Sequence, residues 1–140
     1  MLEHIWTVLC SQSVIDSETN NISIQGVIEQ ITINAEPAQD GFLPIPFELI
    51  SLYIRKESNT PLKGAERIIF TTPSGKSEVV SDGIIDLSSA ERFRHRVKFP
   101  GLPLREAGRY HFVIDIKEEA NDWRKVATIP LTIAFQPTNK

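Results

Sequence analysis

The stretch that decides the fold of this chain is Glu106-Ala107-Gly108-Arg109-Tyr110-His111-Phe112. An acidic residue, a glycine and a tyrosine stand at every second position of it. A tyrosine at the start of a strand can hydrogen-bond through its hydroxyl to the backbone a few residues upstream, and this bond fixes the preceding loop. We therefore predict that Tyr110 anchors the loop before its strand and that Glu106 and Gly108 belong to the same structural corner.

This spacing is similar to the tyrosine corner of immunoglobulin-like sandwiches, in which the chain crosses from one sheet to the other. The resemblance implies a sandwich and implies nothing about chemistry. Phe112 stands where the second cysteine of an antibody domain would follow the tyrosine, and Cys10 is the only cysteine of the chain. An antibody-type disulfide is therefore excluded, and antigen-type recognition is not expected.

Alternating apolar and polar residues predict strands elsewhere in the chain. The runs lie at residues 5–15, 22–33, 47–56, on both sides of the turn 72–76, and at 92–99, 110–116 and 129–135. Gly26 marks a change of phase that predicts a β-bulge, and Pro130 predicts an edge or a bulge. Residues 47–56 are apolar on both faces, which predicts a central strand. The fold class is therefore an all-β, antiparallel β-sandwich of about eight strands with an immunoglobulin-like Greek key.

Length and composition bound the other expectations. The chain has 140 residues and a formal charge of −3, so we expect a single domain over 1–135, a frayed tail over 136–140, and no nucleic acid or membrane as partner. A lone cysteine and a start without signal-peptide features favour the cytoplasm. No apolar run approaches the roughly 18–20 residues that a membrane span needs.

A second resemblance rests on the segments His4-Ile5-Trp6-Thr7-Val8-Leu9-Cys10, Asn20-Asn21-Ile22-Ser23-Ile24 and Val27-Ile28-Glu29-Gln30. They resemble the opening hairpin of a family of small bacterial proteins described as a domain of unknown function. The likeness continues through Gly108-Arg109-Tyr110 to the end of the chain. It implies a stand-alone bacterial β-sandwich without an assigned activity, and no catalytic residue carries over.

Candidates for catalysis are sparse. Cys10 is preceded by apolar residues and has no histidine beside it in sequence, so a packed side chain is favoured over a nucleophile. His95 shares a face with apolar residues, which favours a hydrogen-bonded core histidine over a metal ligand or proton carrier. The Gly75-Lys76-Ser77 triplet lacks the earlier glycine of a phosphate-binding loop. We expect no enzyme, no catalytic residue, no cofactor and no metal.

Acidic residues gather between the predicted strands, for example Asp16 with Glu18, and Asp82 with Asp86. A further group lies at Asp115, Glu118, Glu119 and Asp122. C2-like sandwiches bind calcium through loops at one end, but none of these loops has a tight aspartate spacing. Solvated turn residues are the favoured interpretation.

A stripe of cations is the strongest surface feature. Arg92, Arg94, Arg96 and Lys98 alternate with apolar residues and lie on one face of a strand, about 6.6 Å apart. Arg109, His111 and Lys117 extend the stripe if the next strand is its neighbour. Such a patch could bind an anionic ligand or a partner, or pair with Glu78, Asp82 or Asp115 across neighbouring strands, or coat an edge. Aromatic residues for base stacking are not expected on this face.

The favoured function is a non-enzymatic interaction or assembly module with an unidentified protein partner. The first three predicted strands carry apolar residues on both faces, Trp6 and Tyr53 among them, which predicts a homodimer through a sheet face or edge. The alternative is a binding domain for a polyanion or phosphate that uses the arginine stripe. A deep pocket with converging polar groups would instead favour an enzyme.

Overall fold

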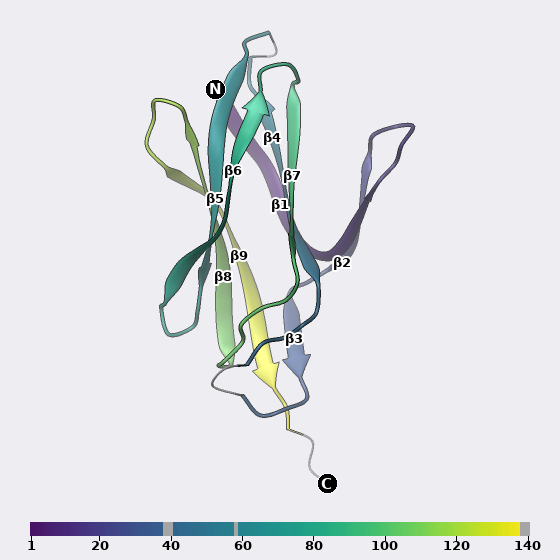
Figure 1. Ribbon diagram of the computed structural model, residues 1–140, viewed down its shortest axis with the longest axis vertical. Coiled ribbons are helices and arrows are strands. Elements are labelled where there is room, and N and C mark those ends of the chain that lie inside the picture. The colour runs from purple at the N-terminus through teal and green to yellow at the C-terminus, as the bar shows by residue number, and fades with distance from the viewer. Residues whose placement is uncertain (38–40, 58, 138–140) are drawn as a thin grey trace.

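The computed structural model describes residues 1–37, 41–57 and 59–137 and consists of nine strands in two packed sheets (Figure 1). Sheet A has the order β2-β1-β4-β7, and sheet B has the order β3-β9-β8-β5-β6. The strands of sheet A are β1 (Leu2–Ile15), β2 (Ile22–Val27), β4 (Phe47–Arg55) and β7 (Arg92–Phe99). Those of sheet B are β3 (Gln30–Ile33), β5 (Leu62–Thr71), β6 (Ser77–Leu87), β8 (Gly108–Glu118) and β9 (Arg124–Phe135).

The strand order is that of an immunoglobulin-like sandwich. Strands β4 and β7 pair as strands B and E do, and β5, β8 and β9 lie side by side as strands C, F and G do. Strand β8 therefore takes the place of strand F, which carries the tyrosine corner. The predicted all-β sandwich is confirmed, with one strand more than the eight expected.

The additional strand arises because the predicted strand 22–33 changes sheets. Strand β2 ends at Val27 in sheet A, and β3 begins at Gln30 in sheet B, where it pairs parallel to β9. Gly26 has a φ of +67°, a left-handed conformation that glycine adopts at little cost. The prediction of one bulged strand was wrong: β2 pairs with β1 in one register on both sides of Gly26, and the chain crosses to sheet B between Val27 and Gln30.

The tyrosine corner is present as predicted. The Tyr110 hydroxyl donates to the carbonyl oxygen of Glu106 over 2.7 Å and accepts from the Glu106 N–H over 3.3 Å. Gly108 has a φ of +130°, and the Glu106 carboxylate accepts from the Ser74 N–H over 2.8 Å. The corner therefore joins the loop before β8 to the turn between β5 and β6.

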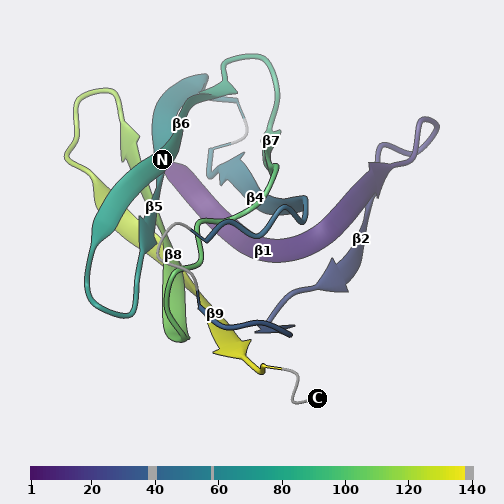
Figure 2. The same cartoon turned by 60° about the horizontal axis from the view of Figure 1, so that its bottom comes forward.

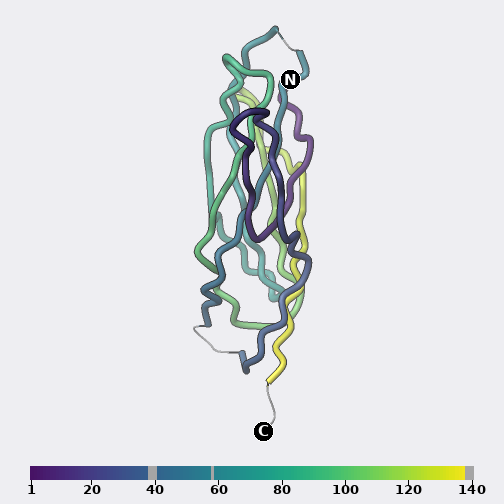
Figure 3. The backbone as a smooth tube through the Cα atoms, turned by 90° about the vertical axis from the view of Figure 1, so that its right-hand side faces the viewer, coloured from purple at the N-terminus to yellow at the C-terminus, as the bar shows by residue number. Residues whose placement is uncertain are grey.

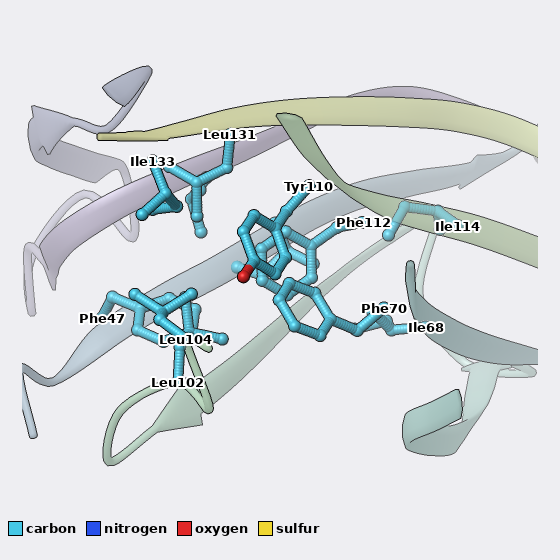
Figure 4. Close-up of a cluster of buried hydrophobic side chains, with 12 residues drawn as sticks. Phe47, Ile68, Phe70, Leu102, Leu104, Tyr110, Phe112, Ile114, Leu131 and Ile133 are labelled. Carbon is cyan, nitrogen blue, oxygen red and sulfur yellow. The ribbon is translucent and has the colours of Figure 1, made fainter. Parts of the chain in front are cut away.

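Four aromatic and eight aliphatic buried side chains form the main core cluster between the sheets (Figure 4). The rings of Phe70 and Tyr110 are stacked with centroids 5.3 Å apart, and those of Phe70 and Phe112 lie 4.9 Å apart. Phe47 of sheet A stacks on Phe99 at 4.8 Å and contacts Phe112 of sheet B at 6.0 Å. These contacts join both sheets through one cluster.

The expected places of β4 and Pro130 are also found. Strand β4 lies between β1 and β7, and its residues 47–51 are buried on both faces. The Thr132 N–H donates to Glu29 next to the start of β3. Pro130 lies two residues earlier in β9, so its nitrogen faces the same side at a point before β3 begins. A proline is tolerated there because no neighbouring strand needs its N–H.

The predicted tail 136–140 is described only at its first residues. Gln136 still donates its N–H to the carbonyl of Ile33 over 2.7 Å, so the backbone is held one residue beyond β9. Residues 138–140 lie outside the described part of the chain. In the predicted loop 35–46, Leu43 forms a bridge with Leu102, and residues 38–40 are not described.

Candidate interaction site

Strand β7 places the arginine stripe on the outer side of sheet A. The strand pairs with β4 and forms one edge of the sheet. Phe93, Val97 and Phe99 pack on the core clusters, so the alternating cations point outward. The predicted two-faced strand is therefore confirmed.

Arg94 is held by the turn between β1 and β2. Its Nη2 donates to the Asn20 carbonyl over 2.6 Å and to Asn20 Oδ1 over 3.0 Å. Asn20 has a φ of +61°, which asparagine tolerates better than most residues. The bonds join β7 to a segment 74 residues away in sequence.

Arg96 is held by a second group of polar residues on the same face. Its Nε donates to Ser13 Oγ over 2.9 Å and lies 3.5 Å from Glu48 Oε1. Glu48 is only 6% exposed, and its two carboxylate oxygens accept from the N–H and the hydroxyl of Ser13. Arg96 therefore compensates a largely buried carboxylate.

The predicted partners of the stripe were wrong. Glu78, Asp82 and Asp115 lie on β6 and β8 of sheet B, and Asp115 pairs with Arg67 at 3.0 Å. The carboxylate that pairs with the stripe is Glu48 of β4. The sequence pattern could not reveal which strands neighbour β7, since that depends on the sheet order.

Arg109 does not extend the stripe. It lies on β8 with His111 and Lys117, and β8 belongs to sheet B, whereas β7 belongs to sheet A. The neighbouring Tyr110 and Phe112 point into the core, so these three residues face outward on the opposite side of the sandwich. The predicted extension was wrong because the chain changes sheets at the tyrosine corner.

The second half of β1 and β2 form a hairpin that leaves the body of the sandwich, which we call the arm (residues 12–25; Figures 1 and 2). Figure 3 shows it in front of the other strands when the molecule is seen from that side. At its tip, Asp16 accepts from the N–H groups of Glu18 and Thr19. Val14 is 53% exposed and Ile15 is 36% exposed, so the arm presents apolar surface on both of its faces.

A groove of about 510 Å³ lies between the arm and the stripe, and we call it the arm groove. Trp6 and Leu52 lie at its base, on the paired strands β1 and β4. Ile15 and Ile22 contribute from the arm, and Arg92, Arg94 and Arg96 from β7. The expectation that this face lacks an aromatic residue was wrong, because Trp6 comes from a strand that is distant in sequence.

A separate polar cluster lies between the sheets. Glu66 of β5 is 1% exposed, and its carboxylate accepts from the Tyr53 hydroxyl of β4 and contacts Nδ1 of His95 of β7. Burial and the neighbouring carboxylate raise the pKa of Tyr53, so its hydroxyl keeps its proton. His95 thus has a partner, as the interpretation of a hydrogen-bonded core histidine predicts.

Two further titratable groups, the half-buried His4 and the buried Cys10, have no evident chemical role. Burial lowers the pKa of His4, whose Nε2 lies 2.6 Å from Thr7 Oγ1. Cys10 has no exposed surface, and burial raises the pKa of its thiol, with the Glu48 carboxylate adding to the effect. A thiol that stays protonated is a poor nucleophile. Cys10 is therefore the small packed residue that the sequence favoured.

The expectation that the acidic residues gather between strands was wrong for Asp82 and Asp86, which lie within β6, and for Asp115 and Glu118, which lie within β8. Several of the acidic residues have structural partners. Asp16 closes the turn of the arm, Asp86 accepts from Ser88, and Asp115 pairs with Arg67. Within residues 1–37, 41–57 and 59–137, no three histidine, cysteine or acidic side chains come close enough to form a metal site.

Glu48, Ser13, Glu66 and Tyr53 were missed as interacting residues by the sequence analysis. A signal was present for Glu66, because it is in phase with Ile68 and Phe70 on the buried face of β5. Glu48 is likewise in phase with Ile50. An acidic residue in phase with buried apolar residues predicts a partnered carboxylate.

Comparison with known proteins adds no functional assignment. No family model matches the chain, and a search of curated proteins finds no match either. Membership of the bacterial family that the opening hairpin resembles therefore stays a prediction. The described part of the chain contains no helix that is long and apolar enough to cross a membrane.

Proposed function

We propose that this chain is a non-enzymatic interaction and assembly module that forms a homodimer through its arm. The observation that carries the proposal is the exposed apolar surface of the arm and of the adjoining end of β2, where Val14 is 53% exposed and Val27 is 62% exposed. Exposed apolar residues gathered in one place are typical of interaction surfaces. Cytoplasmic localisation and a bacterial origin belong to the same proposal.

The edge of sheet A supports pairing with a second copy. Strand β2 is the end strand of the sheet, and its sequence Ile-Ser-Ile-Gln-Gly-Val contains neither proline nor a charged residue. Prolines and charged residues commonly protect edge strands from pairing with other chains. Strand β6, at one edge of sheet B, carries Glu78, Asp82 and Asp86 and an irregularity in its register. The unprotected edge of β2 is thus suited to antiparallel pairing across a two-fold axis.

The burial of reactive side chains supports a function other than catalysis. Glu66 and Cys10 are at most 1% exposed, so a substrate in solution has no access to them.

Tyr53 is fully buried as well, so it is not one of the surplus apolar residues from which the homodimer was predicted. The homodimer proposal rests on the exposed apolar residues of the arm and of the end of β2.

Val27→Lys is expected to weaken the dimer at least about ten-fold, because it puts a charge in place of an exposed apolar side chain of β2 and removes apolar contact area. The matched control is Ile84→Lys, which alters a residue of β6 that is 71% exposed. Sedimentation equilibrium of both variants and the parent protein measures the effect. A parent protein that is monomeric at high micromolar concentration contradicts the proposal, as does equal dimerisation of the Val27→Lys variant.

Anion binding by the stripe is the second candidate function. Arg92 and Lys98 are exposed, and among the described residues no hydrogen bond or ion pair engages their charged groups. Arg94 and Arg96, in contrast, already bind Asn20, Ser13 and Glu48. Two of the four cations of the stripe thus already bond to neighbouring residues of the protein, which favours the interaction module over a polyanion site.

The protein is expected to elute from heparin below about 0.15 M salt, because two separated exposed cations release few counterions. The charge reversals Arg92→Glu and Lys98→Glu should change the free energy of unfolding by only about 0.5 kcal/mol. Heparin chromatography and urea denaturation measure these quantities. Retention of the parent protein above physiological salt, lost on charge reversal, would place anion binding first.

A further inference from the structure

We infer that the arm groove binds an extended segment of a partner protein in which acidic and apolar residues alternate. Its carboxylates would face Arg92 and Arg94, and its apolar side chains would face Trp6 and the arm. This inference goes beyond homodimerisation, which uses the free edge of β2 and not the groove.

The charge of the groove selects an acidic occupant. Its lining includes Arg92, Arg94 and Arg96, and none of its lining residues is acidic. The chain as a whole carries a formal charge of −3, so this concentration of cations is local. Among the described residues, the only carboxylate paired with these arginines is Glu48, which is 6% exposed and compensates Arg96. Arg94 bonds through Nη2 only to neutral oxygens of Asn20, so its positive charge, like that of Arg92, is left to attract carboxylates from outside.

The apolar base of the groove favours a peptide over a simple anion. Trp6 and Leu52 are both half-buried, and Ile15 and Ile22 of the arm line the groove as well. Burial of apolar surface favours binding roughly in proportion to the area removed from water. An inorganic anion or a sulfated sugar gains nothing from this surface, whereas an apolar side chain of a peptide does.

The spacing of the arginines fits an extended segment. Arg92 and Arg94 are two residues apart on one face of β7, which separates them by about 6.6 Å. Acidic side chains at alternate positions of an extended chain have the same repeat. In such a bound segment, the residues between the acidic ones point to the opposite side, toward the arm, where Ile15 and Ile22 lie.

Part of the groove is already held in place for binding. The two bonds from Arg94 to Asn20 hold its guanidinium beside the groove, and Ser13 holds that of Arg96. Side chains that are fixed before binding lose less conformational entropy when a ligand arrives. The arm also makes the site concave, which suits a peptide better than the flat surface of a bilayer.

Fluorescence of Trp6 offers a direct test. The parent for the experiment is Trp123→Phe, which leaves Trp6 as the only tryptophan. Trp123 lies beside Arg67 and Lys117 of sheet B, away from the groove. The probe is the capped peptide Gly-Glu-Leu-Glu-Leu-Gly, and its counterpart has glutamine in place of both glutamates.

We expect saturable change of the Trp6 emission with the acidic peptide and at least about ten-fold weaker binding of the glutamine peptide. Arg92→Gln and Arg94→Gln should each weaken binding of the acidic peptide about three- to five-fold. Arg109→Gln, on the other sheet, is the matched control and should leave binding unchanged.

The inference is overturned if the acidic peptide does not bind, if the glutamine peptide binds equally well, or if Arg109→Gln has the same effect as Arg92→Gln. Tighter binding of oligo(dT) or of vesicles containing phosphatidylserine overturns it as well, in favour of nucleic acid or membrane. Sedimentation of the same samples reports dimerisation separately. A protein that dimerises but does not bind the acidic peptide therefore rejects only the inference. A protein that binds the peptide but stays monomeric rejects only the proposed homodimer.

Discussion

Replacing His95 with leucine is expected to lower the free energy of unfolding by about 2–3 kcal/mol, since it removes a hydrogen-bonding partner from a buried charged group. The carboxylate of Glu66 is 1% exposed, and its contacts in the core are the Tyr53 hydroxyl and Nδ1 of His95. With leucine at position 95, the carboxylate oxygen of Glu66 that contacts His95 faces an apolar side chain instead. Urea denaturation of the variant and the parent measures the loss.

A matched control and a second variant separate this cause from a general effect of losing a histidine. His111→Leu changes a half-buried histidine on the outer side of sheet B and should shift stability by only about 0.5 kcal/mol. Adding Glu66→Gln to His95→Leu should recover stability, because an amide costs less to bury than an uncompensated charge. A further loss in the double variant would contradict the assigned role of the cluster.

Tyr110→Phe is expected to lower the free energy of unfolding by about 1–3 kcal/mol, the usual penalty for a buried polar group that loses its partner. The hydroxyl of Tyr110 both donates to the carbonyl of Glu106 and accepts from its N–H. Phenylalanine keeps the ring that stacks on Phe70 but leaves both backbone groups of Glu106 unpaired. Denaturant unfolding and hydrogen exchange of the Glu106 amide measure the effect.

Glu106→Ala is the control for this prediction, because it removes the side chain that accepts from Ser74 and keeps the backbone bonds to Tyr110. Its effect should stay within about 0.5 kcal/mol, as is usual for surface substitutions. An unchanged denaturant midpoint in Tyr110→Phe, or equal losses in both variants, would reject the role of the hydroxyl as the anchor.

Most of the fold could be predicted from local patterns. The alternation at β7, β8 and β9 repeats every second residue, which identifies a strand wherever one face is buried. The tyrosine corner could be predicted as well, because both partners of its bond lie within five residues of sequence. The division of residues 22–33 between two sheets could not, since a glycine at a change of phase is compatible with either a bulge or a crossing.

The candidate site was predicted only in part. The stripe was found because its cations alternate along one strand, but its partner Glu48 and the aromatic residue Trp6 lie on other strands. Arg109 was assigned to the same patch because it follows in sequence, although the corner carries it to the opposite sheet. Neighbours across strands depend on strand order, which no single strand encodes.

The sequence by itself determined the all-β class, the strands with one buried face and the anchored corner at Tyr110, because each rests on residues within one strand or one turn. The tertiary structure alone decided which cations stay available, which carboxylates are buried, and that the arm and β7 enclose a groove around Trp6. These features join segments that are far apart in sequence, as Arg94 and Asn20 are by 74 residues. Such contacts follow from the packing and order of the sheets, which the periodicity of a single segment does not specify.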